Sequence, residues 1–517
     1  MKTKKIDCCF LVASNSRKSY QELSKDYAAI EPPTWALLLA ESTRSIGYNV
    51  KIIDANAEGL KEEQILQRII EYDPRLICFV VYGQNVNAGT TNMSGAVHIA
   101  NYIKENKIKN PISFIGSHVQ ALPKETLTKE KSIDFVFTNE GVYALRNILK
   151  LDKIDNKNIK NIKGIALRLQ NKIKINPAEK VVPSEKMDID LPGYAWDLLP
   201  FKYKPLDLYR SPMWHAEYDF KKRSPYASIQ TSLGCQFKCS FCMINLINRN
   251  NEDDIGVASN YSGMRFWSPN FIIKEFDKLI EMGVKTIRIV DEMFLLNQKY
   301  YLPLCEMLAK RNKDDSLMMW SYSRIDTVKR PEILKIVRKA GIKWLCLGIE
   351  SGDKKVRLEV AKGKFEDVDV KQVIKKVHES DINVMANYIF GLPGDTEETI
   401  NKTFELSKNL CTAGWNTYAA MALPGSQLYK EAILKNISLP DSYEGYSFHS
   451  YDTIPLPTEK LSAAKILRLR DEAFIKYHTH LPFINLIKKK FGSKAADNIL
   501  EMTKIKLKRK ILEDGRN

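Results

Sequence analysis

Short apolar segments alternate with amphipathic segments twice along this chain of 517 residues. In residues 1–150 the apolar runs are IDCCFLVA, NVKIIDA, LICFVVYG, PISFIGS and IDFVFTNE, and helix-like stretches separate them. Strands that alternate with helices form parallel sheets with helices on both faces, and such sheets bind ligands at the carboxyl ends of their strands. The pattern therefore predicts an α/β fold that begins with a doubly wound, Rossmann-like domain.

The same alternation starts again near Tyr226 and predicts a second domain over residues 226–440. Its strand-like runs are ASIQTSLG, TIRIVDEM, MMWSYSRID, WLCLGIES, NVMANYIFGLPG and TYAAMALPG. Six such units predict a partial (β/α)6 version of the eight-unit TIM-type barrel, with functional residues at the carboxyl ends of the strands. A chain of this length is too long for one hydrophobic core, which agrees with two domains.

Two further regions complete the expected organisation. Residues 151–225 contain a hairpin pattern, NIKGIALRLQNKIKI, and then a stretch rich in Pro, Trp and Tyr. So many aromatic side chains do not stay in water, so we expect an ordered linker that lies over a surface. Residues 441–517 have the pattern of a C-terminal helical region.

Composition narrows the classes of function. The net charge is +17, but the lysines are spread along the chain, so we expect no nucleic-acid partner. The apolar start is interrupted by Asp7 and is too short for a signal peptide, and no apolar run approaches the roughly 18 residues that span a bilayer. We therefore expect a cytoplasmic protein without disulfides. Six of its nine cysteines lie in apolar segments and are expected in the core: Cys8, Cys9, Cys78, Cys305, Cys346 and Cys411.

The other three cysteines, Cys235, Cys239 and Cys242, lie close together in SLGCQFKCSFCMINL. Structural zinc sites use four ligands, and here the nearest histidine is His215. An iron–sulfur cluster can be held by three thiolates, which leaves one iron open to an external ligand. Because the segment follows a predicted strand, the spacing favours such a cluster in a chemical role over zinc or over core cysteines.

The C-x3-C-x2-C spacing, with Phe241 before the last cysteine, resembles the signature of radical S-adenosylmethionine (SAM) enzymes. Later segments agree in order, and the resemblance covers about residues 226–440: RIVDEMFLLN, SYSRIDTV, LGIESG, FGLPGDTEET and ALPGSQLY. It implies that Cys235, Cys239 and Cys242 hold a [4Fe-4S] cluster. The open iron would bind SAM, and the reduced cluster would cleave it to a 5′-deoxyadenosyl radical.

The same resemblance assigns further residues to SAM. Phe241 would lie near the adenine, and a carboxylate of the Asp-Glu pair after the second strand would accept hydrogen bonds from the methionine ammonium group. Arg324 would pair with the methionine carboxylate and Glu350 with the ribose, although a mutual salt bridge between these two is an alternative. The glycines of FGLPG would allow the backbone to approach the adenosine closely, or they would only form an ordinary turn. The candidate SAM-binding residues are Phe241, Asp291, Glu292, Arg324, Glu350, Gly391 and Gly394.

The first domain has no G-x-G-x-x-G after its first strand and no G-x4-GK[ST], which disfavours dinucleotides and nucleoside triphosphates. Its segments 31–57, 114–123 and 133–145 resemble the cobalamin-binding domain that precedes many radical SAM domains, and the tail 455–478 resembles the C-terminal region of the same group. The resemblance implies a corrin that faces the barrel mouth. The candidate cobalamin contacts are Tyr82, Gln84, Asn85, Gly116, Ser117, His118, Glu140 and Gly141.

Two departures from cobalamin proteins are visible. The D-x-H-x-x-G motif is absent, as it generally is in the radical group, so cobalt would have no histidine beneath it. Val142 stands where the group often has a second acidic residue. We expect His118, in GSHVQALP, to bond the backbone or an edge of a cofactor rather than cobalt.

The resemblance implies a methyltransferase that acts on an unactivated carbon of a small-molecule, glycan or natural-product substrate through the 5′-deoxyadenosyl radical and methylcobalamin. An oxidative cyclase or rearrangement enzyme would use the same cofactors without methyl transfer. A cobalamin-binding sensor and a tRNA methylthiolating enzyme, which needs a second cluster, fit the residues less well. An electron donor such as flavodoxin or ferredoxin is implied. The substrate would bind between the barrel mouth, the first domain and the C-terminal helices.

Overall fold

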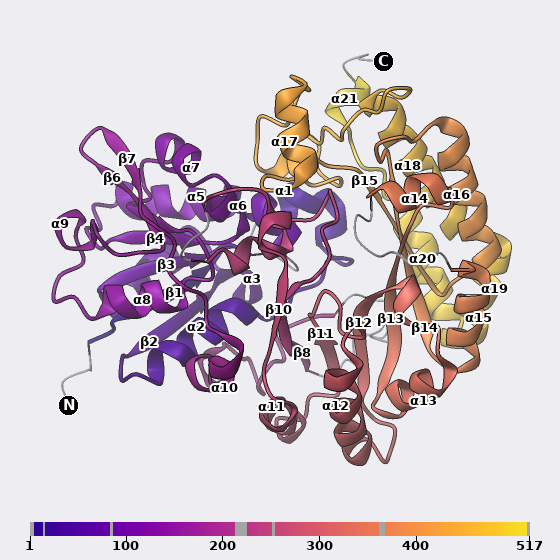
Figure 1. Cartoon of the computed structure of the whole chain (residues 1–517), viewed down its shortest axis with the longest axis horizontal. Coiled ribbons are helices and arrows are strands. Elements are labelled where there is room, and N and C mark those ends of the chain that lie inside the picture. Colours follow the sequence, from indigo (N-terminus) through magenta and orange to yellow (C-terminus); the bar gives the residue numbers. More distant parts are fainter. Residues whose placement is uncertain are drawn as a thin grey trace.

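The computed structural model shows two α/β units side by side, and the C-terminal helices lie along the outer side of the second unit (Figure 1). The first unit runs from indigo to magenta in Figure 1, and the barrel and tail run from magenta to yellow. The structure describes residues 5–13, 16–82, 86–211, 225–250, 254–360 and 368–513.

The first sheet has seven strands in the order β2-β1-β3-β4-β5-β6-β7, and the first five are parallel. These five match the apolar runs, because strands covered on both faces consist of almost continuous apolar residues. Helices α2 and α8 pack on one face, and α4, α5 and α7 pack on the other. The bounds are β1 (Cys8–Val12), β2 (Val50–Asp54), β3 (Leu76–Val80), β4 (Ile112–Ile115), β5 (Phe135–Phe137), α2 (Thr34–Arg44), α4 (Glu62–Tyr72), α5 (Gly89–Glu105), α7 (Pro123–Lys129) and α8 (Val142–Leu149).

The hairpin predicted between residues 161 and 175 forms from β6 (Ile165–Leu169) and β7 (Lys172–Ile175). It belongs to the first sheet, because β6 pairs antiparallel with β5. The sequence pattern instead predicts this segment as part of the linker 151–225. The hairpin joins the sheet because the first three residues of β6 become fully buried beside β5, whereas β7 is mostly exposed and forms the edge of the sheet.

The second unit is the expected incomplete barrel, with six parallel strands in the order β15-β14-β13-β12-β11-β8. Its helices lie outside the strands (Figure 1). The bounds are β8 (Tyr226–Ile229), β11 (Thr286–Ile289), β12 (Met318–Arg324), β13 (Ile342–Glu350), β14 (Asn383–Phe390), β15 (Gly414–Ala419), α11 (Pro269–Glu281), α12 (Gln298–Arg311), α13 (Pro331–Lys339), α14 (Lys354–Val360), α15 (Val370–Glu379), α16 (Glu397–Leu410) and α17 (Gln427–Leu434).

The run ASIQTSLG, expected as a single strand, is divided into β8 and a second short strand, β9 (Ser232–Cys235). Strand β9 leaves the barrel sheet and pairs antiparallel with β10 (Gly263–Phe266), so that Cys235 lies opposite Gly263. The first cysteine of the cluster motif therefore lies in a two-stranded antiparallel sheet rather than in a loop that directly follows a barrel strand.

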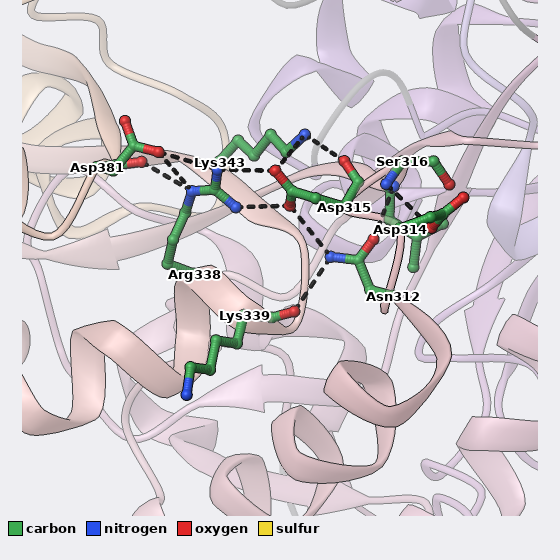
Figure 2. Close-up of polar contacts among 9 residues, drawn as sticks. Asn312, Asp314, Asp315, Ser316, Arg338, Lys339, Lys343 and Asp381 are labelled. Atoms are coloured by element: carbon green, nitrogen blue, oxygen red, sulfur yellow. Dashed lines mark hydrogen bonds and ion pairs between the residues drawn. The ribbon is translucent and has the colours of Figure 1, made fainter.

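At the amino ends of the barrel strands, polar side chains connect three loops (Figure 2). Arg338, near the end of α13, donates to Asp315 before β12 at 2.7 Å and to Asp381 before β14 at 2.9 Å. The Lys343 ammonium donates to the carbonyl of Asp315 at 2.7 Å. In barrels of this type the amino-end face serves stability, and these exposed pairs each contribute only modestly.

The C-terminal region covers the outer side of the last barrel strands with α18 (Ala463–His478), α19 (Leu481–Phe491), α20 (Ser493–Lys504) and α21 (Lys510–Glu513). The ring of Trp415 on β15 stacks on that of Tyr477 at 5.1 Å. The start of the chain is also attached here, because Gln21 donates to the carbonyl of His449 at 2.7 Å. Among the described residues, no helix has the length and apolar character needed to cross a membrane.

Candidate cofactor site between the two domains

The three cysteines of the motif are gathered in one largely buried loop. Cys235 ends β9, and Cys239 and Cys242 follow in a turn in which the Cys242 N–H donates to the Cys239 carbonyl at 3.1 Å. Burial raises the pKa of the Cys235 and Cys239 thiols to about 12. Thiolates at this position therefore require a bound cation, as the thiolates of an iron–sulfur cluster have.

Asn245, which no sequence pattern singled out, holds the first cysteine. Its Oδ1 accepts the N–H of Cys235 at 2.8 Å, and its Nδ2 donates to the Cys235 carbonyl at 2.8 Å. Gly234 has a φ of 85°, and a Cβ there would lie 2.2 Å from Nδ2 of Asn248, so this position requires glycine. The only sequence signal was the position of two asparagines just after the motif, and asparagine is common in loops.

Asp291 and Glu292, both predicted to meet SAM, have different surroundings. The Asp291 carboxylate accepts hydrogen bonds from Thr231 N, Thr231 Oγ1 and Ser232 Oγ, each at 2.6 Å, and so holds the turn between β8 and β9. Burial raises the pKa of Glu292 to about 7, and its charge acts on the thiols of Cys235 and Cys242. Of the two carboxylates, Glu292 is therefore the better candidate for a ligand contact.

Arg324, at the end of β12, donates from Nε to Asp326 at 2.9 Å, and its guanidinium lies 3.5 Å from the centre of the Phe237 ring in the cysteine loop. Glu350, at the end of β13, has a φ of 64°, which is a strained left-handed conformation for a residue with a side chain. Burial raises the pKa of Glu350 to about 7, and the nearby Arg324 opposes that rise. Both charges act on Cys239, so both residues lie near the cysteine loop.

The two glycines of FGLPG form a tight turn with φ of 83° at Gly391 and 85° at Gly394. Asp395 closes the turn, because its Oδ2 accepts the N–H groups of Gly391 and Leu392, both at 3.0 Å. A Cβ on Gly391 would lie 2.9 Å from Ile466 of α18, so packing also requires glycine there. Phe241 packs beside this turn in an apolar cluster with Leu392. The contacts of Phe241, Gly391 and Gly394 with SAM stay predictions.

A pocket opens at the carboxyl ends of β1 and β3, where the strand order of the first sheet reverses. Open α/β sheets bind ligands at such a reversal. Tyr82, a candidate cobalamin contact, is among its lining residues, and its ring meets Trp35 edge-on at 5.9 Å. Its contact with cobalamin stays a prediction. The other lining residues were missed, because they come from distant segments that share no motif; among them are Ala13, Trp35, Asn56, Ala88, Thr91 and Asn92.

None of the remaining cobalamin candidates that the structure describes is among the residues that line this pocket. A Cβ on Gly116 would lie 2.1 Å from the carbonyl oxygen of Val81, so the close approach at this glycine is to the protein's own backbone. Ser117 is buried directly after it. Gly141 begins α8 with a φ of 78°. Gln84 and Asn85 lie outside the described residues.

His118 is enclosed by protein groups. Its Nδ1 lies 3.2 Å from Oγ1 of Thr90, and its ring meets Tyr443 of the C-terminal region edge-on at 5.1 Å. Burial lowers the pKa of His118 to about 3, so the ring is neutral. The structure shows a contact with a threonine side chain, and the expected contact of His118 with the backbone or a cofactor edge stays a prediction.

The pocket and the cysteine loop share residues. Tyr82 packs against the apolar cluster that contains Cys235, with Phe237 and Cys242 also at its edge, and it also lines the pocket in the first sheet. The structure thus brings together a sheet-edge pocket, one buried and two half-buried thiols, and two half-buried carboxylates near the boundary of the two domains.

Comparison with known families agrees with this arrangement. The family model described as the Radical SAM superfamily matches residues 229–407, and the one described as the B12 binding domain matches residues 25–149. The chain is a radical SAM enzyme with a B12-binding domain. The radical SAM domain implies a [4Fe-4S] cluster and SAM, and the B12-binding domain implies cobalamin. The three clustered thiols, which need a cation to ionise, and the pocket at the strand reversal fit these groups.

The similarity to two curated relatives extends over most of the chain. The uncharacterized methyltransferase PH0819 of Pyrococcus horikoshii is 25% identical over 86% of this chain and 88% of its own length. The anaerobic magnesium-protoporphyrin IX monomethyl ester cyclase of Cereibacter sphaeroides is 23% identical over 84% of this chain, which spans only 65% of the cyclase.

A solved structure has the same fold. The radical SAM methyltransferase TsrM from Kitasatospora setae, solved with cobalamin and a [4Fe-4S] cluster, has a TM-score of 0.62 and 16% identity over 83% of this chain and 75% of its own. TsrM has also been solved with a tryptophan substrate and a SAM analogue. At this identity the likeness concerns the fold.

Proposed function

We propose that the protein is a cobalamin-dependent radical SAM methyltransferase that methylates an unactivated carbon of a small-molecule, glycan or natural-product substrate. The observation that carries the proposal is the position of Tyr82, which lines the sheet pocket and also packs beside the cysteine loop. When bound, the cluster with SAM supplies a 5′-deoxyadenosyl radical, and cobalamin supplies the methyl group. A substrate between the two domains would be within reach of both.

The residues of the chain would bind and orient SAM. In this proposal Cys235, Cys239 and Cys242 hold the cluster. The ionised carboxylate of Glu292 attracts the methionine ammonium group, and that of Glu350 accepts hydrogen bonds from the ribose hydroxyls. Both carboxyl groups have a pKa near 7 because they are buried, so a cationic ligand favours their ionised forms. The Arg324 guanidinium, placed against Phe237, offers positive charge to the methionine carboxylate.

A second candidate function is an oxidative cyclase or rearrangement enzyme with the same cofactors and no methyl transfer. The similarity to a cyclase over 84% of the chain favours it, whereas the methyltransferase PH0819 is matched over more of its own length. Both functions require an electron donor, for which flavodoxin or ferredoxin is our proposal. Neither function depends on a protein general base, because abstraction of hydrogen from carbon by a radical needs none.

The proposal is tested by reconstituting the protein without oxygen in the presence of iron, sulfide and hydroxocobalamin. We expect about four iron atoms and one cobalt atom per chain. Cys239→Ala should lose most of the iron, and Cys411→Ser, at a cysteine outside the motif, should keep it. Iron without cobalt would contradict the role of the first domain.

The reaction itself is tested with methyl-deuterated SAM and candidate substrates. Transfer of the labelled methyl group together with 5′-deoxyadenosine formation would support the methyltransferase. A product that forms with 5′-deoxyadenosine but carries no label would contradict methyl transfer and favour the cyclase or rearrangement enzyme.

A further inference from the structure

Four rings form a continuous row between the two candidate cofactor sites. The rings of Tyr418 on β15 and of Phe448 meet edge-on at 5.1 Å, and the centres of the Phe448 and His449 rings lie 4.0 Å apart. The centres of the His449 and Tyr20 rings lie 5.3 Å apart. This aromatic row joins three distant parts of the chain, which are the last barrel strand, the segment between α17 and α18, and the start of the first domain.

The two ends of the aromatic row lie at different candidate sites. Tyr20 lines the pocket in the first sheet, where cobalamin is expected. Tyr418 packs against the same apolar cluster as Phe241, the candidate contact of the SAM adenine, and this cluster contains Leu392 of the glycine turn. A molecule that lies along the row would therefore have the SAM site at one end and the cobalamin pocket at the other. A substrate that reacts with both cofactors needs this position.

The inner face of β15 keeps accessible surface beside the row. Side chains alternate between the two faces of a strand. Trp415 and Thr417 are buried on the side that α18 covers. Asn416 and Tyr418, on the opposite face, are partly exposed. Because the helices lie outside the strands, the surface that stays exposed is on the inner side of the barrel.

Two charged groups beside the row are already paired. Arg470 lies 5.0 Å from the centre of the Phe448 ring, and it donates to Asp471 at 3.0 Å. Glu31, which lines the pocket together with Tyr20, is held by Arg288. A charged ligand group that is buried here would compete with these pairs for a counter-ion, and burial of an unpaired charge is costly. The surroundings of the row therefore favour an uncharged ligand.

The row also carries neutral hydrogen-bonding groups. The phenol oxygen of Tyr418 accepts a hydrogen bond from Nδ2 of Asn416 at 2.6 Å, which leaves the phenol O–H as a donor. Burial lowers the pKa of His449 well below its usual range, so its ring is neutral. Neutral groups of this kind suit a hydroxyl or a carbonyl.

We propose that the aromatic row binds the substrate, and that the substrate is an uncharged molecule with a flat, largely apolar ring system and a hydroxyl or carbonyl group. Aromatic side chains pack on flat rings in offset or edge-on arrangements, and a few polar groups in a mostly apolar site fix the orientation of the ligand. This inference rests on the proposed function, because it places the substrate between SAM and cobalamin. It narrows the substrate class by disfavouring phosphorylated and carboxylated molecules.

The test is equilibrium dialysis, without oxygen, of the protein reconstituted with its cluster, SAM and hydroxocobalamin. The probes are naphthol, its carboxylated analogue naphthoate and its saturated analogue decalol. We expect naphthol to bind about tenfold more tightly than either analogue. Tyr418→Leu and Phe448→Leu each remove a ring but keep an apolar side chain, so the dissociation constant of naphthol should rise about tenfold. Tyr203→Leu, at an exposed tyrosine of the linker, is the control and should leave it unchanged.

Each outcome supports or overturns a part of the inference. Equal affinities for naphthol and naphthoate would overturn the uncharged class, and parent-like affinity for naphthol in both leucine variants would overturn the row as the site. Tyr418→Phe keeps the ring and should bind naphthol more tightly than Tyr418→Leu, so it gives the reading if the leucine variant takes up less iron. A parent protein that holds about four iron atoms and one cobalt atom but binds no naphthol would overturn this inference and leave the proposed function standing.

Discussion

Glu140 of the B12-binding domain and Arg265 of β10 form an ion pair between the domains, with 2.7 Å between Oε2 and Nη1 and both side chains buried. Arg265 also donates to Oδ1 of Asn248 at 2.8 Å, and Asn248 donates to Asn245, which holds Cys235. Glu140, a candidate cobalamin contact, is thus connected by hydrogen bonds to the first cysteine of the motif.

Glu140→Ala should therefore destabilise the protein by about 3 kcal/mol or more, because it leaves the Arg265 charge buried without its carboxylate. Iron content after reconstitution should fall as well, because Arg265, which donates to Asn248, is no longer held in place by Glu140. Chemical denaturation and iron analysis measure the two effects. Asp277→Asn, which breaks the more exposed pair with Arg311, should cost less than about 1 kcal/mol. Equal costs for the two variants would contradict the role given to Glu140.

The segment before α2 is anchored in the barrel by a second buried pair, Glu31 with Arg288 of β11. The Arg288 guanidinium lies 4.7 Å from the centre of the Trp320 ring, and Tyr226 donates to Glu31 at 3.3 Å. Glu31→Ala should release this segment, so limited proteolysis should cut it faster than in the parent. Lys18→Ala removes only an exposed partner of Glu444 and should leave the cleavage rate unchanged. Equal rates in all three proteins would show that the pair does not anchor the segment.

Gly116→Ala should lower stability by about 1–3 kcal/mol, because its Cβ would meet backbone that cannot move aside easily. The contact is with Val81, which also lines the sheet pocket, so cobalamin affinity should fall in the same variant. Gly263→Ala is the control, since a Cβ there has nothing within 4 Å. Thermal unfolding and cobalamin titration give the two readings, and a Gly116→Ala protein with the parent's values would refute the steric argument.

His118 should make the protein less stable at acidic pH. Its folded-state pKa is lowered to about 3 by burial, while the unfolded chain has a histidine pKa near 6.5. The unfolded state therefore binds a proton first, so stability present above pH 6.5 is lost as the pH falls, by about 2 kcal/mol at pH 5. His118→Gln should flatten the dependence of unfolding on pH between 8 and 5. Parallel curves for parent and variant would show that His118 does not contribute.

Much of the fold followed from local patterns. The five parallel strands of the first sheet and the six of the barrel are all found at the apolar runs, because a strand buried on both faces must be apolar whatever its neighbours are. The hairpin of residues 165–175 was also visible, but its place was not. Whether a hairpin extends a sheet or lies in a linker depends on which buried edge it meets, and β5 lies 28 positions before it.

The candidate site residues also divide into those that a local pattern reveals and those whose role depends on packing. The cysteine motif is local, so its spacing alone pointed to a cluster. Asp291 and Glu292 are neighbours in sequence, yet one holds the turn between β8 and β9 and the other lies near the thiols. Successive residues at a strand end point in different directions, and only the packing decides which of them faces the site.

The sequence by itself determined the two α/β units and the three-thiol motif, because strand and helix periods and short ligand spacings are properties of nearby residues. Only the tertiary structure decided how the domains act on one another. Asn87 meets Met243 and Glu140 meets Arg265 across more than a hundred positions, through contacts that exist only when both domains are folded and packed together. Side chains of this kind carry no spacing signal, because their partners are fixed by the packing of surfaces and not by the order of residues.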